Sequence, residues 1–255
     1  MFQIERQEKI LNYINEKQTV TTQELSEMLN TSLVTIRNDI NKLAARSLIV
    51  KTHGGAVCRQ HRSNIEIPSV IRFQENIESK RSIAAIAIEH IEDGDVILLD
   101  SGSTTLEIAK RIQAKHVTVI TDDIKIAIIL AEKGGVSLMM TGGTLLPSVF
   151  SLVGTQAVDF INTIKVNKLF LGCDAIDVDW GISNRTMEET PVKNAMIQAA
   201  RQVIAVADCS KFNRKVFARL CGLDALDTLI TDKVTPEIRE RLETAGVQVL
   251  AAQSS

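Results

Sequence analysis

From Lys80 onward, short runs of Val, Ile and Leu alternate with helix-forming stretches, and this alternation constrains the fold more than any other feature. The runs predict strands at 96–99, 117–120, 136–140, 168–171, 203–207, 228–230 and 247–250. The stretches between them predict helices at 80–91, 105–112, 123–133, 157–164, 191–201 and 236–245. Almost continuously apolar strands separated by helices are typical of a parallel sheet covered on both faces. We therefore predict an α/β fold with a Rossmann-like parallel sheet over residues 74–255.

Polar residues follow several of these predicted strands at the points where the strands end. In open α/β sheets, ligands bind beyond the carboxyl ends of the strands, so these residues are expected to meet at one edge. In the turn 101–105, hydroxyls and backbone N–H groups precede a predicted helix and can bind an anion. The same turn can equally serve only as the cap of that helix. The strand-end residues are Asp100, Ser101, Gly102, Ser103, Thr104, Thr105, Thr121, Gly142, Gly143, Asp174, Asp208 and Lys211.

Several charged residues near this edge have two interpretations. Lys211 is suited either to bind a phosphate or to form a salt bridge with the acid three residues before it. Asp174 and Asp177 are suited to bind sugar hydroxyls or to cap the next turn. Glu189 and Lys193 flank a predicted helix start, where capping and a surface ion pair are ordinary roles.

Residues 1–57 have a different pattern, with apolar residues at helical spacing. Helices are expected at about 4–16 and at 22–29, and a third helix begins after Ser32, whose side chain is suited to be its N-cap. A short β-ribbon is expected at 49–56. This order predicts a winged helix-turn-helix domain, in which the helix after the turn is the one that enters the DNA major groove.

The predicted third helix has two faces. Ile36, Ile40 and Leu43 recur at helical spacing, which predicts a buried stripe. On the opposite face, Arg suits guanine edges, Asn suits adenine edges and Leu or Val suits thymine methyl groups, whereas Lys42, Arg46 and Lys51 suit phosphates. A helical bundle with a solvated polar face would have the same shape. The candidate DNA contacts are Ser32, Leu33, Val34, Thr35, Arg37, Asn38, Asn41, Lys42, Lys51 and His53.

The formal net charge of −2 conceals an asymmetry along the chain. Residues 1–62 contain nine Lys and Arg against six Asp and Glu, whereas residues 63–255 contain 20 against 25. Residues 32–62 contain six basic residues and a single acidic residue, Asp39. A basic N-terminal part on an acidic body places the attraction to phosphates in the first domain.

The composition fits a small domain followed by a larger one in 255 residues. No apolar run is long enough to cross a bilayer and the polar N-terminus has no signal-peptide pattern, so we expect a cytoplasmic protein without a membrane partner. The four cysteines have no metal-ligand spacing, and we expect neither a metal site nor disulfides nor a cofactor. Residues 58–73 are polar and lack periodicity, and we expect them to form a linker.

Several of these residues match a known family. In the N-terminal domain, Thr35-Ile36-Arg37, Asp39-Ile40 and His53-Gly54-Gly55-Ala56 resemble the signature of the DeoR family of bacterial sugar-metabolism repressors. The matching residues of the body are those at 100–104, 142–143, 154, 174, 189, 193 and 208–211. The resemblance implies a sensor domain similar in fold to ribose-5-phosphate isomerase and CoA transferases, with a phosphorylated sugar held by the hydroxyl-rich loop. It adds Glu189 and Lys193 to the expected effector-binding residues.

In the N-terminal domain, Thr31, Asn38 and Lys51 depart from the family pattern, and in the body one stretch departs from it. Thr121-Asp122-Asp123 stands where the family commonly has Thr-Asn-Ser. Two additional negative charges near an anion site weaken phosphate binding unless they face away or cap the next helix. The location of these two carboxylates is therefore a test of the predicted site.

Together these features predict a sequence-specific transcriptional repressor of carbohydrate-metabolism genes, controlled by a phosphorylated sugar or sugar derivative and without catalytic residues. The expected partners are double-stranded operator DNA, the effector and further copies of the chain. A homodimer or homotetramer is expected, because one small DNA-binding head rarely supplies enough contacts and dimers match palindromic operators.

Two alternatives remain. One is a sugar-phosphate isomerase-like enzyme with an appended DNA-binding domain, since residues 171–177 resemble the acidic stretch of the ribose-5-phosphate isomerase site. The segment after Asp177 lacks the Lys that this chemistry requires in a Gly-rich turn. The other is a translation-factor-like interaction subunit, which the basic winged domain disfavours.

Overall fold

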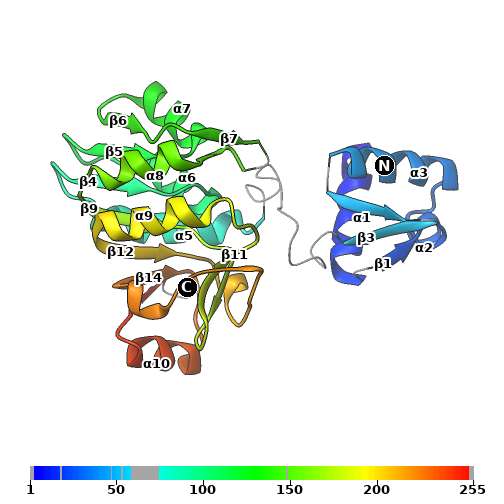
Figure 1. The fold of residues 1–255 in the computed structure, drawn as a ribbon. Helices are drawn as coiled ribbons and strands as arrows, with labels where there is room; N and C mark the ends of the chain where they lie inside the picture. The colour runs from blue at the N-terminus through cyan, green and yellow to red at the C-terminus, as the bar shows by residue number, and fades with distance from the viewer. Residues whose placement is uncertain are drawn as a thin grey trace. The chain divides into compact units, whose positions relative to one another are not determined.

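The computed structural model describes residues 3–17, 19–46, 48–52, 54–58, 75–147 and 149–252. The chain divides into two compact units, Met1–Ile71 and Arg72–Ser255, each of which can be followed by colour in Figure 1. Of the expected linker 58–73, only Cys58 belongs to the described residues. Cys58 differs from the expectation, because it ends a strand and is 2% exposed, with its thiol donating to Asn15 Oδ1 at 3.3 Å. The ordered N-terminal domain therefore extends at least to Cys58.

The described part of the N-terminal unit consists of helices packed on an antiparallel sheet. Its elements are α1 (Gln3–Lys17), β1 (Thr19–Thr21), α2 (Thr22–Leu29), α3 (Leu33–Ala45), β2 (Ile49–Thr52) and β3 (Gly55–Cys58). The strand order β1-β3-β2 adds a third strand to the predicted ribbon, because the extended connection before α2 pairs with β3. Ile36, Ile40 and Leu43 are buried in the core of this unit, as their spacing predicts.

The ends of α2 and α3 are fixed by capping residues. Thr21 Oγ1 accepts the N–H of Glu24 at 3.1 Å while the Glu24 carboxylate accepts the N–H of Thr21 at 2.6 Å, which is a capping box. Asn30 ends α2 in the left-handed conformation, with φ of 47°. Ser32 Oγ accepts the N–H of Thr35 at 3.2 Å, which confirms the predicted N-cap of α3. Local sequence thus determines the turn between the two helices.

Asp39 is the one acid on α3, and it lies on the buried side of the helix with 2% of its surface exposed. Arg6 Nε of α1 donates to Asp39 Oδ2 at 2.6 Å, and Gln7 Nε2 donates to Oδ1 at 2.9 Å. Both carboxylate oxygens are therefore bonded to α1, which compensates for the burial of the charge. This network holds α3 against α1.

The body is built on a seven-stranded parallel sheet, in the order β15-β14-β12-β9-β4-β5-β6. All seven predicted strands are present, with bounds that differ from the predicted ones by at most three residues. The strands are β4 (Val96–Leu99), β5 (Thr118–Thr121), β6 (Ser137–Met140), β9 (Val166–Leu171), β12 (Ala200–Val206), β14 (Thr228–Thr231) and β15 (Gln248–Ala251).

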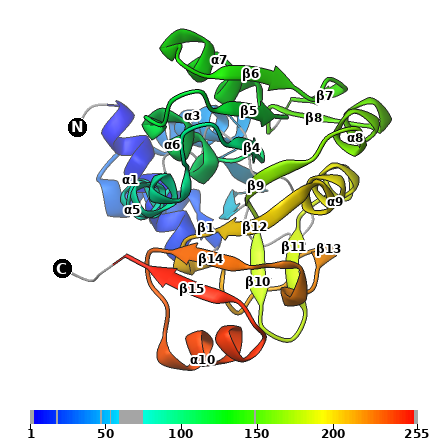
Figure 2. The same ribbon diagram turned by 90° about the vertical axis from the view of Figure 1, so that its left-hand side faces the viewer.

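Helices cover both faces of this sheet, which is the arrangement that near-continuous apolar strands require. Figure 2 shows α5 and α6 on one side of the strands and α8 and α9 on the other. The first face is covered by α5 (Ile77–Ala87), α6 (Ser103–Arg111) and α7 (Ile124–Lys133), and the second by α8 (Thr155–Asn162), α9 (Thr190–Ala199) and α10 (Pro236–Thr244). Within the described residues, no helix combines the length and the apolar character needed to cross a bilayer.

Several short elements are absent from the sequence-based prediction. A hairpin joins β7 (Thr144–Leu146) and β8 (Ser151–Val153), and a small antiparallel sheet joins β10 (Ala175–Asp177), β11 (Gly181–Asn184) and β13 (Ala218–Cys221). The described part of the chain also contains the single-turn 3-10 helices η2 (Ile88–His90), η3 (Cys209–Lys211) and η4 (Leu223–Ala225). Strands of three or four residues are too short to carry a periodic signal.

The network around Asp39 leads to a prediction for the stability of the N-terminal unit. Asp39→Ala leaves Arg6 and Gln7 without their acceptor, and we expect it to lower the free energy of unfolding of this unit by about 1–3 kcal/mol. Urea unfolding of the full chain measures this. The single tyrosine, Tyr13, lies in this unit and the single tryptophan, Trp180, lies in the body, so their spectroscopic signals follow the two units separately. Asn38→Ala, at the exposed neighbouring position, is the control and should change stability by less than about 0.5 kcal/mol. Equal effects of the two substitutions would contradict the role of Asp39.

Candidate nucleic-acid interface and ligand pocket

The outward face of α3 presents the side chains that the sequence predicts for contact with DNA. Leu33 is 41% exposed and Val34 is 65% exposed, although apolar side chains of this size are usually buried. Arg37 and Asn38 are exposed, as are Ser32, Asn41 and Lys42, while Thr35 is half-buried. This face combines guanidinium, carboxamide, ammonium and apolar groups on one helix, which are the groups that read base edges and phosphates in a major groove.

The wing contacts the helices at two points. Thr22, the first residue of α2, donates from its backbone N–H to Gly54 O at 2.8 Å and from Oγ1 at 2.7 Å. Lys51 Nζ of β2 donates to Asn41 Oδ1 of α3 at 2.7 Å, so these two predicted contacts form a pair across the groove between wing and helix. The carboxamide oxygen of Asn41 is thereby engaged by the wing. His53, the remaining predicted contact, lies outside the described residues.

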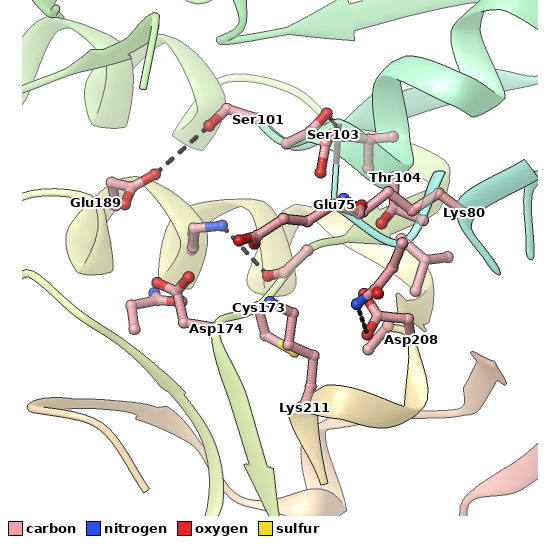
Figure 3. A pocket seen from close by; sticks show the side chains of 18 residues that line it. Glu75, Lys80, Ser101, Ser103, Thr104, Cys173, Asp174, Glu189, Asp208 and Lys211 are labelled. Carbon is pink, nitrogen blue, oxygen red and sulfur yellow. Dashed lines mark hydrogen bonds between the residues drawn. The ribbon is translucent and has the colours of Figure 1, made fainter. Parts of the chain in front are cut away.

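The body has a cavity at the carboxyl ends of its central strands, as Figure 3 shows. Strand-end loops from β4, β9 and β12 line it, together with α5, α6, α9 and β11. The lining residues are Glu75, Asn76, Lys80, Ser101, Gly102, Ser103, Thr104, Thr105, Gly172, Cys173, Asp174, Asn184, Glu189, Lys193, Val206, Ala207, Asp208 and Lys211. Ten of the predicted effector-binding residues are among them, which supports the argument from converging strand ends.

The turn 101–105 forms one wall and leads into α6. Gly102 occupies the N-cap position and supplies no side-chain cap, so the first turn of the helix faces the cavity with backbone N–H groups and the hydroxyls of Ser103 and Thr104. The Thr105 hydroxyl donates to Gly102 O at 2.9 Å and is thereby oriented. An uncapped helix N-terminus lined with hydroxyls attracts anions.

Asp122 and Asp123 do not line the cavity. Asp123 caps α7, because its Oδ1 accepts the N–H groups of Lys125 at 2.7 Å and Ile126 at 3.1 Å. Its Oδ2 accepts the Gly102 N–H at 3.3 Å, so that this donor of the turn is already engaged. Asp122 is buried and accepts a hydrogen bond from Ser151 Oγ at 2.7 Å. The departure from the family pattern therefore builds a carboxylate contact behind the turn, away from the ligand face.

Burial controls the charge of these two acids. Burial raises the pKa of Asp123 to about 6, against the hydrogen bonds from Ile126 and Lys125. Burial, followed by the nearby charge of Asp100, raises the pKa of Asp122 well above its usual range. A raised pKa means that the carboxyl group holds its proton at a higher pH than it would in water, which lowers the negative charge behind the turn.

Asp100 forms the floor beneath the cavity. It is fully buried and pairs with Lys193 Nζ of α9, while its Oδ2 also accepts the Gly172 N–H at 2.8 Å. Lys193 Nζ donates in addition to Gly172 O at 3.3 Å. Burial alone would lower the pKa of Lys193, but the negative charges of Asp100 and Glu189 raise it by more. The ammonium group therefore stays protonated. Asp100 is thus a structural partner of a lining lysine, whereas the sequence placed it among the ligand contacts.

The remaining acids of the cavity differ in their surroundings. Asp174 accepts the backbone N–H of Arg185 at 3.1 Å, and the Arg185 side chain approaches it at 3.8 Å. Ser101 Oγ donates to Glu189 Oε1 at 3.5 Å. Asp208 accepts hydrogen bonds from the backbone N–H and hydroxyl of Ser210. These side chains are held by protein donors yet face the cavity in Figure 3.

Three predicted residues lie away from the cavity. The Thr121 hydroxyl donates to Leu99 O at 2.7 Å and so joins β5 to β4. Gly142 and Gly143 form a left-handed turn with φ of 70° and 114°, and a Cβ at Gly143 would lie 2.6 Å from Val153 O. Gly143 therefore serves the close approach of the chain to β8, and neither glycine lines the cavity in which they were predicted to contact a ligand.

Sequence reasoning missed the other lining residues, which are Glu75, Asn76, Lys80, Gly172, Cys173, Asn184, Val206 and Ala207. Gly172 and Cys173 directly follow β9, and the strand-end rule that selected Asp174 could have included them. Glu75, Asn76 and Lys80 precede the first strand of the sheet, where that rule gives no signal. Burial raises the pKa of the Cys173 thiol to about 12, so it is not a nucleophile at neutral pH.

Asp177 has no part in the cavity. Its Oδ1 accepts the N–H groups of Asp179 at 3.0 Å and Trp180 at 2.9 Å, which caps the turn between β10 and β11. Lys215 lies 3.4 Å from the same oxygen. Of the two interpretations of Asp177, the structure favours the capping role.

Two family models match the chain. The DeoR-like helix-turn-helix domain matches residues 6–62, and the DeoR C terminal sensor domain matches residues 75–233. The HTH-type transcriptional regulator GlpR of Haloferax volcanii is 34% identical over 98% of this chain and 98% of its own length. The HTH-type transcriptional repressor GlcR of Bacillus subtilis is 33% identical over 99% of this chain and 98% of its own length.

Solved structures that match the chain share only 17–18% sequence identity with it. Ribose 5-phosphate isomerase A from Methanocaldococcus jannaschii matches with a TM-score of 0.41 and 18% identity, covering 55% of this chain and 56% of that chain.

The pKa of Asp123 leads to a prediction for the pH dependence of stability. Its value of about 6 lies above the usual 3.8, so between these values the folded state binds more protons and the free energy of unfolding falls as the pH rises. Asparagine caps helices as well as aspartate and cannot ionise, but its Nδ2 cannot accept the Gly102 N–H that Asp123 Oδ2 accepts. The stability of Asp123→Asn relative to wild type should therefore rise by about 1–3 kcal/mol between pH 4 and pH 7, as measured by urea unfolding at the two pH values. Asp159→Asn, at an exposed position of α8, is the control; a difference between Asp123→Asn and wild type that is the same at both pH values would contradict the prediction.

Proposed function

The chain belongs to the DeoR family of transcriptional regulators, and from that premise we propose that it is a sequence-specific repressor of carbohydrate-metabolism genes controlled by a phosphorylated sugar or sugar derivative. The observation that carries the proposal is the presence in one chain of an exposed recognition helix and a polar cavity at the strand ends. The first reads DNA, and the second binds a small anionic effector.

In the proposed interface, α3 enters the major groove. Arg37 and Asn38 contact base edges, and Leu33 and Val34 contact thymine methyl groups. Phosphate contacts position the helix and come from cations at its rim. The candidates for these are Lys42 of α3, Arg46 at its C-cap and Lys51 of β2. Ser32, Thr35, Asn41 and His53 are further candidates for contacts to the DNA.

In the proposed effector site, the phosphate binds at the first turn of α6. The N–H groups of this turn and the hydroxyls of Ser103 and Thr104 donate to its oxygens. Lys211 lines the same cavity and supplies positive charge. The acids Asp174, Glu189 and Asp208 accept hydrogen bonds from sugar hydroxyls. Neither a metal ion nor a cofactor has a role in this site.

The proposed functional form is an oligomer of this chain. One winged domain contributes a small contact area, so a homodimer or homotetramer that presents two or more heads to a palindromic operator is the form we propose. The proposed location is the cytoplasm, where DNA and sugar phosphates are both available to it.

An isomerase function has less support from the structure. The acidic stretch that resembles an isomerase site contributes Asp174 to the cavity, whereas Asp177 caps a turn outside it. The chain also lacks the lysine expected after Asp177. The relatives that match nearly the whole chain are named as transcriptional regulators.

DNA recognition can be tested on α3 with a duplex selected from a random pool by the full chain. Arg37→Ala should weaken specific binding by about 1–3 kcal/mol and relax discrimination at one base pair. Lys42 is an exposed cation of the same helix, and Lys42→Ala should weaken binding to all sequences similarly. It should also reduce the slope of log affinity against log salt concentration by about 1. Titrations at several salt concentrations measure both effects. Wild-type affinity and discrimination in both variants would remove α3 from the interface.

The effector site can be tested with a carboxylate placed in the anion-binding turn. Ser103→Glu should repel the phosphate and occupy its space, so the variant should bind the selected duplex normally but no longer respond to effector. The effector is the pentose or hexose phosphate that most raises the melting temperature of the wild-type chain. Gln156→Glu, which places the same charge in the exposed first turn of α8, is the matched control. If Ser103→Glu responded as the control does, the phosphate would not bind at this turn.

A further inference from the structure

The cavity is too small to enclose the effector as it stands. Its free volume is about 50 Å³, and it opens to solvent. A single buried water needs about 10–15 Å³ by the same measure, so the space holds a few waters. A sugar phosphate is several times larger and can be enclosed only if one wall moves.

The walls differ in how firmly they are held. The floor consists of strand ends and the buried Asp100–Lys193 pair, and moving it would expose an ion pair together with the sheet core. The turn 101–105 is continuous with β4 and α6. The segment Glu75–Asn76 precedes α5, belongs to no strand or helix, and is attached through the side chain of the exposed Asn76. It is the wall that can move at the lowest cost.

Hydrogen bonds attach this segment to the loop after β12 and to α5, whose Lys80 N–H donates to Asn76 O at 3.1 Å. Asn76 Nδ2 donates to Asp208 Oδ1 at 3.1 Å and lies 3.4 Å from Ser210 Oγ, which places the amide on the loop after β12. Lys80 Nζ donates to the carbonyl oxygen of Glu75. Asn76 has a left-handed backbone, with φ of 51°, and provides no side-chain cap to α5. Its side chain is thus used for the contact with Asp208.

Glu75 lies where an anionic ligand would have to bind. In Figure 3 its side chain extends into the cavity, between the hydroxyls of Ser103 and Thr104 on one side and Cys173 on the other. A phosphate and a carboxylate repel each other at short range in a partly desolvated site. The side chain that fills the ligand-free cavity therefore also opposes occupancy by phosphate.

We propose that effector binding displaces Glu75 from the cavity and breaks the contact between Asn76 and Asp208, and that this displacement is the signal sent to the DNA-binding domain. The inference rests on the proposed function of the cavity. Glu75 and Asn76 stand at the N-terminal end of the sensor, so residues 59–74 connect them to the N-terminal domain. A ligand that binds only when the segment has moved shifts the protein toward that arrangement, and DNA binding must in turn change the effector affinity by the same factor.

The first experiment measures ligand affinity, with inorganic phosphate and the sugar phosphate selected by thermal shift as probes. If Glu75 must leave the cavity, Glu75→Gln should bind both probes about 3- to 10-fold more tightly than wild type, because the competing charge is gone. A residue that contacts the ligand would give the opposite sign. Unchanged or weaker binding by Glu75→Gln would overturn the proposal.

The second experiment measures coupling in the full chain, as the ratio of DNA affinities with and without the sugar phosphate. Asn76→Gly keeps the left-handed backbone without strain and removes the contact with Asp208. The wild-type ratio is expected to be about 5-fold or more, and the variant ratio should approach 1 while the sugar phosphate still binds. His116→Gly, at another left-handed position of the body with φ of 59°, is the matched control and should keep the wild-type ratio.

The outcomes separate this proposal from the function on which it rests. If wild type binds no selected duplex, or if no sugar phosphate changes its affinity for DNA, the proposed function fails. If wild type responds and Asn76→Gly responds to the same extent, the function stands and the displacement of Glu75–Asn76 is wrong. Retained binding of the sugar phosphate by Asn76→Gly shows that a lost response comes from coupling and not from misfolding.

Discussion

The carboxylate of Asp100 is the interaction on which the sensor cavity depends. It lies at the end of β4, accepts the backbone N–H of Gly172 after β9, and pairs with Lys193 of α9. One buried side chain therefore joins two neighbouring strands and a covering helix at the edge where the cavity opens. A buried charge is tolerated only when it is paired and hydrogen-bonded, so this edge is fixed by the need to satisfy Asp100 and Lys193 together. The same requirement keeps a lysine beneath an anionic ligand.

Most of the fold could be predicted from the sequence, because its main signals are local. Apolar runs and their spacing located all seven strands of the sheet, and Ser32 marked the start of the recognition helix. The strand-end rule found Ser101–Thr105, Asp208 and Lys211, since parallel strands end at a common edge. The short strands of the small sheets were not predictable in this way, because a segment such as 175–177 owes its conformation to partners distant in sequence.

The contacts that escaped prediction share one property. Asp39 meets Arg6 across 33 positions, Asp174 meets Arg185 across a hairpin, and Asn76 meets Asp208 across 132 positions. Residue type and spacing do not identify such partners, since any exposed acid or amide could serve. The same limit applies to Gly142 and Gly143, where the sequence shows conformational freedom without showing whether a ligand or the chain itself approaches. Distant pairing, rather than local propensity, decides these roles.

The division of α3 into two faces has an evolutionary consequence. The core face carries Ile36, Asp39, Ile40 and Leu43, whereas Leu33, Val34, Arg37 and Asn38 have no part in the core. Substitutions at exposed positions usually change stability by no more than about 0.5 kcal/mol, so the second set is free to vary while the first is constrained. A lineage can therefore acquire a new DNA target by drift on one side of a single helix. The sensor and its ligand need not change with it.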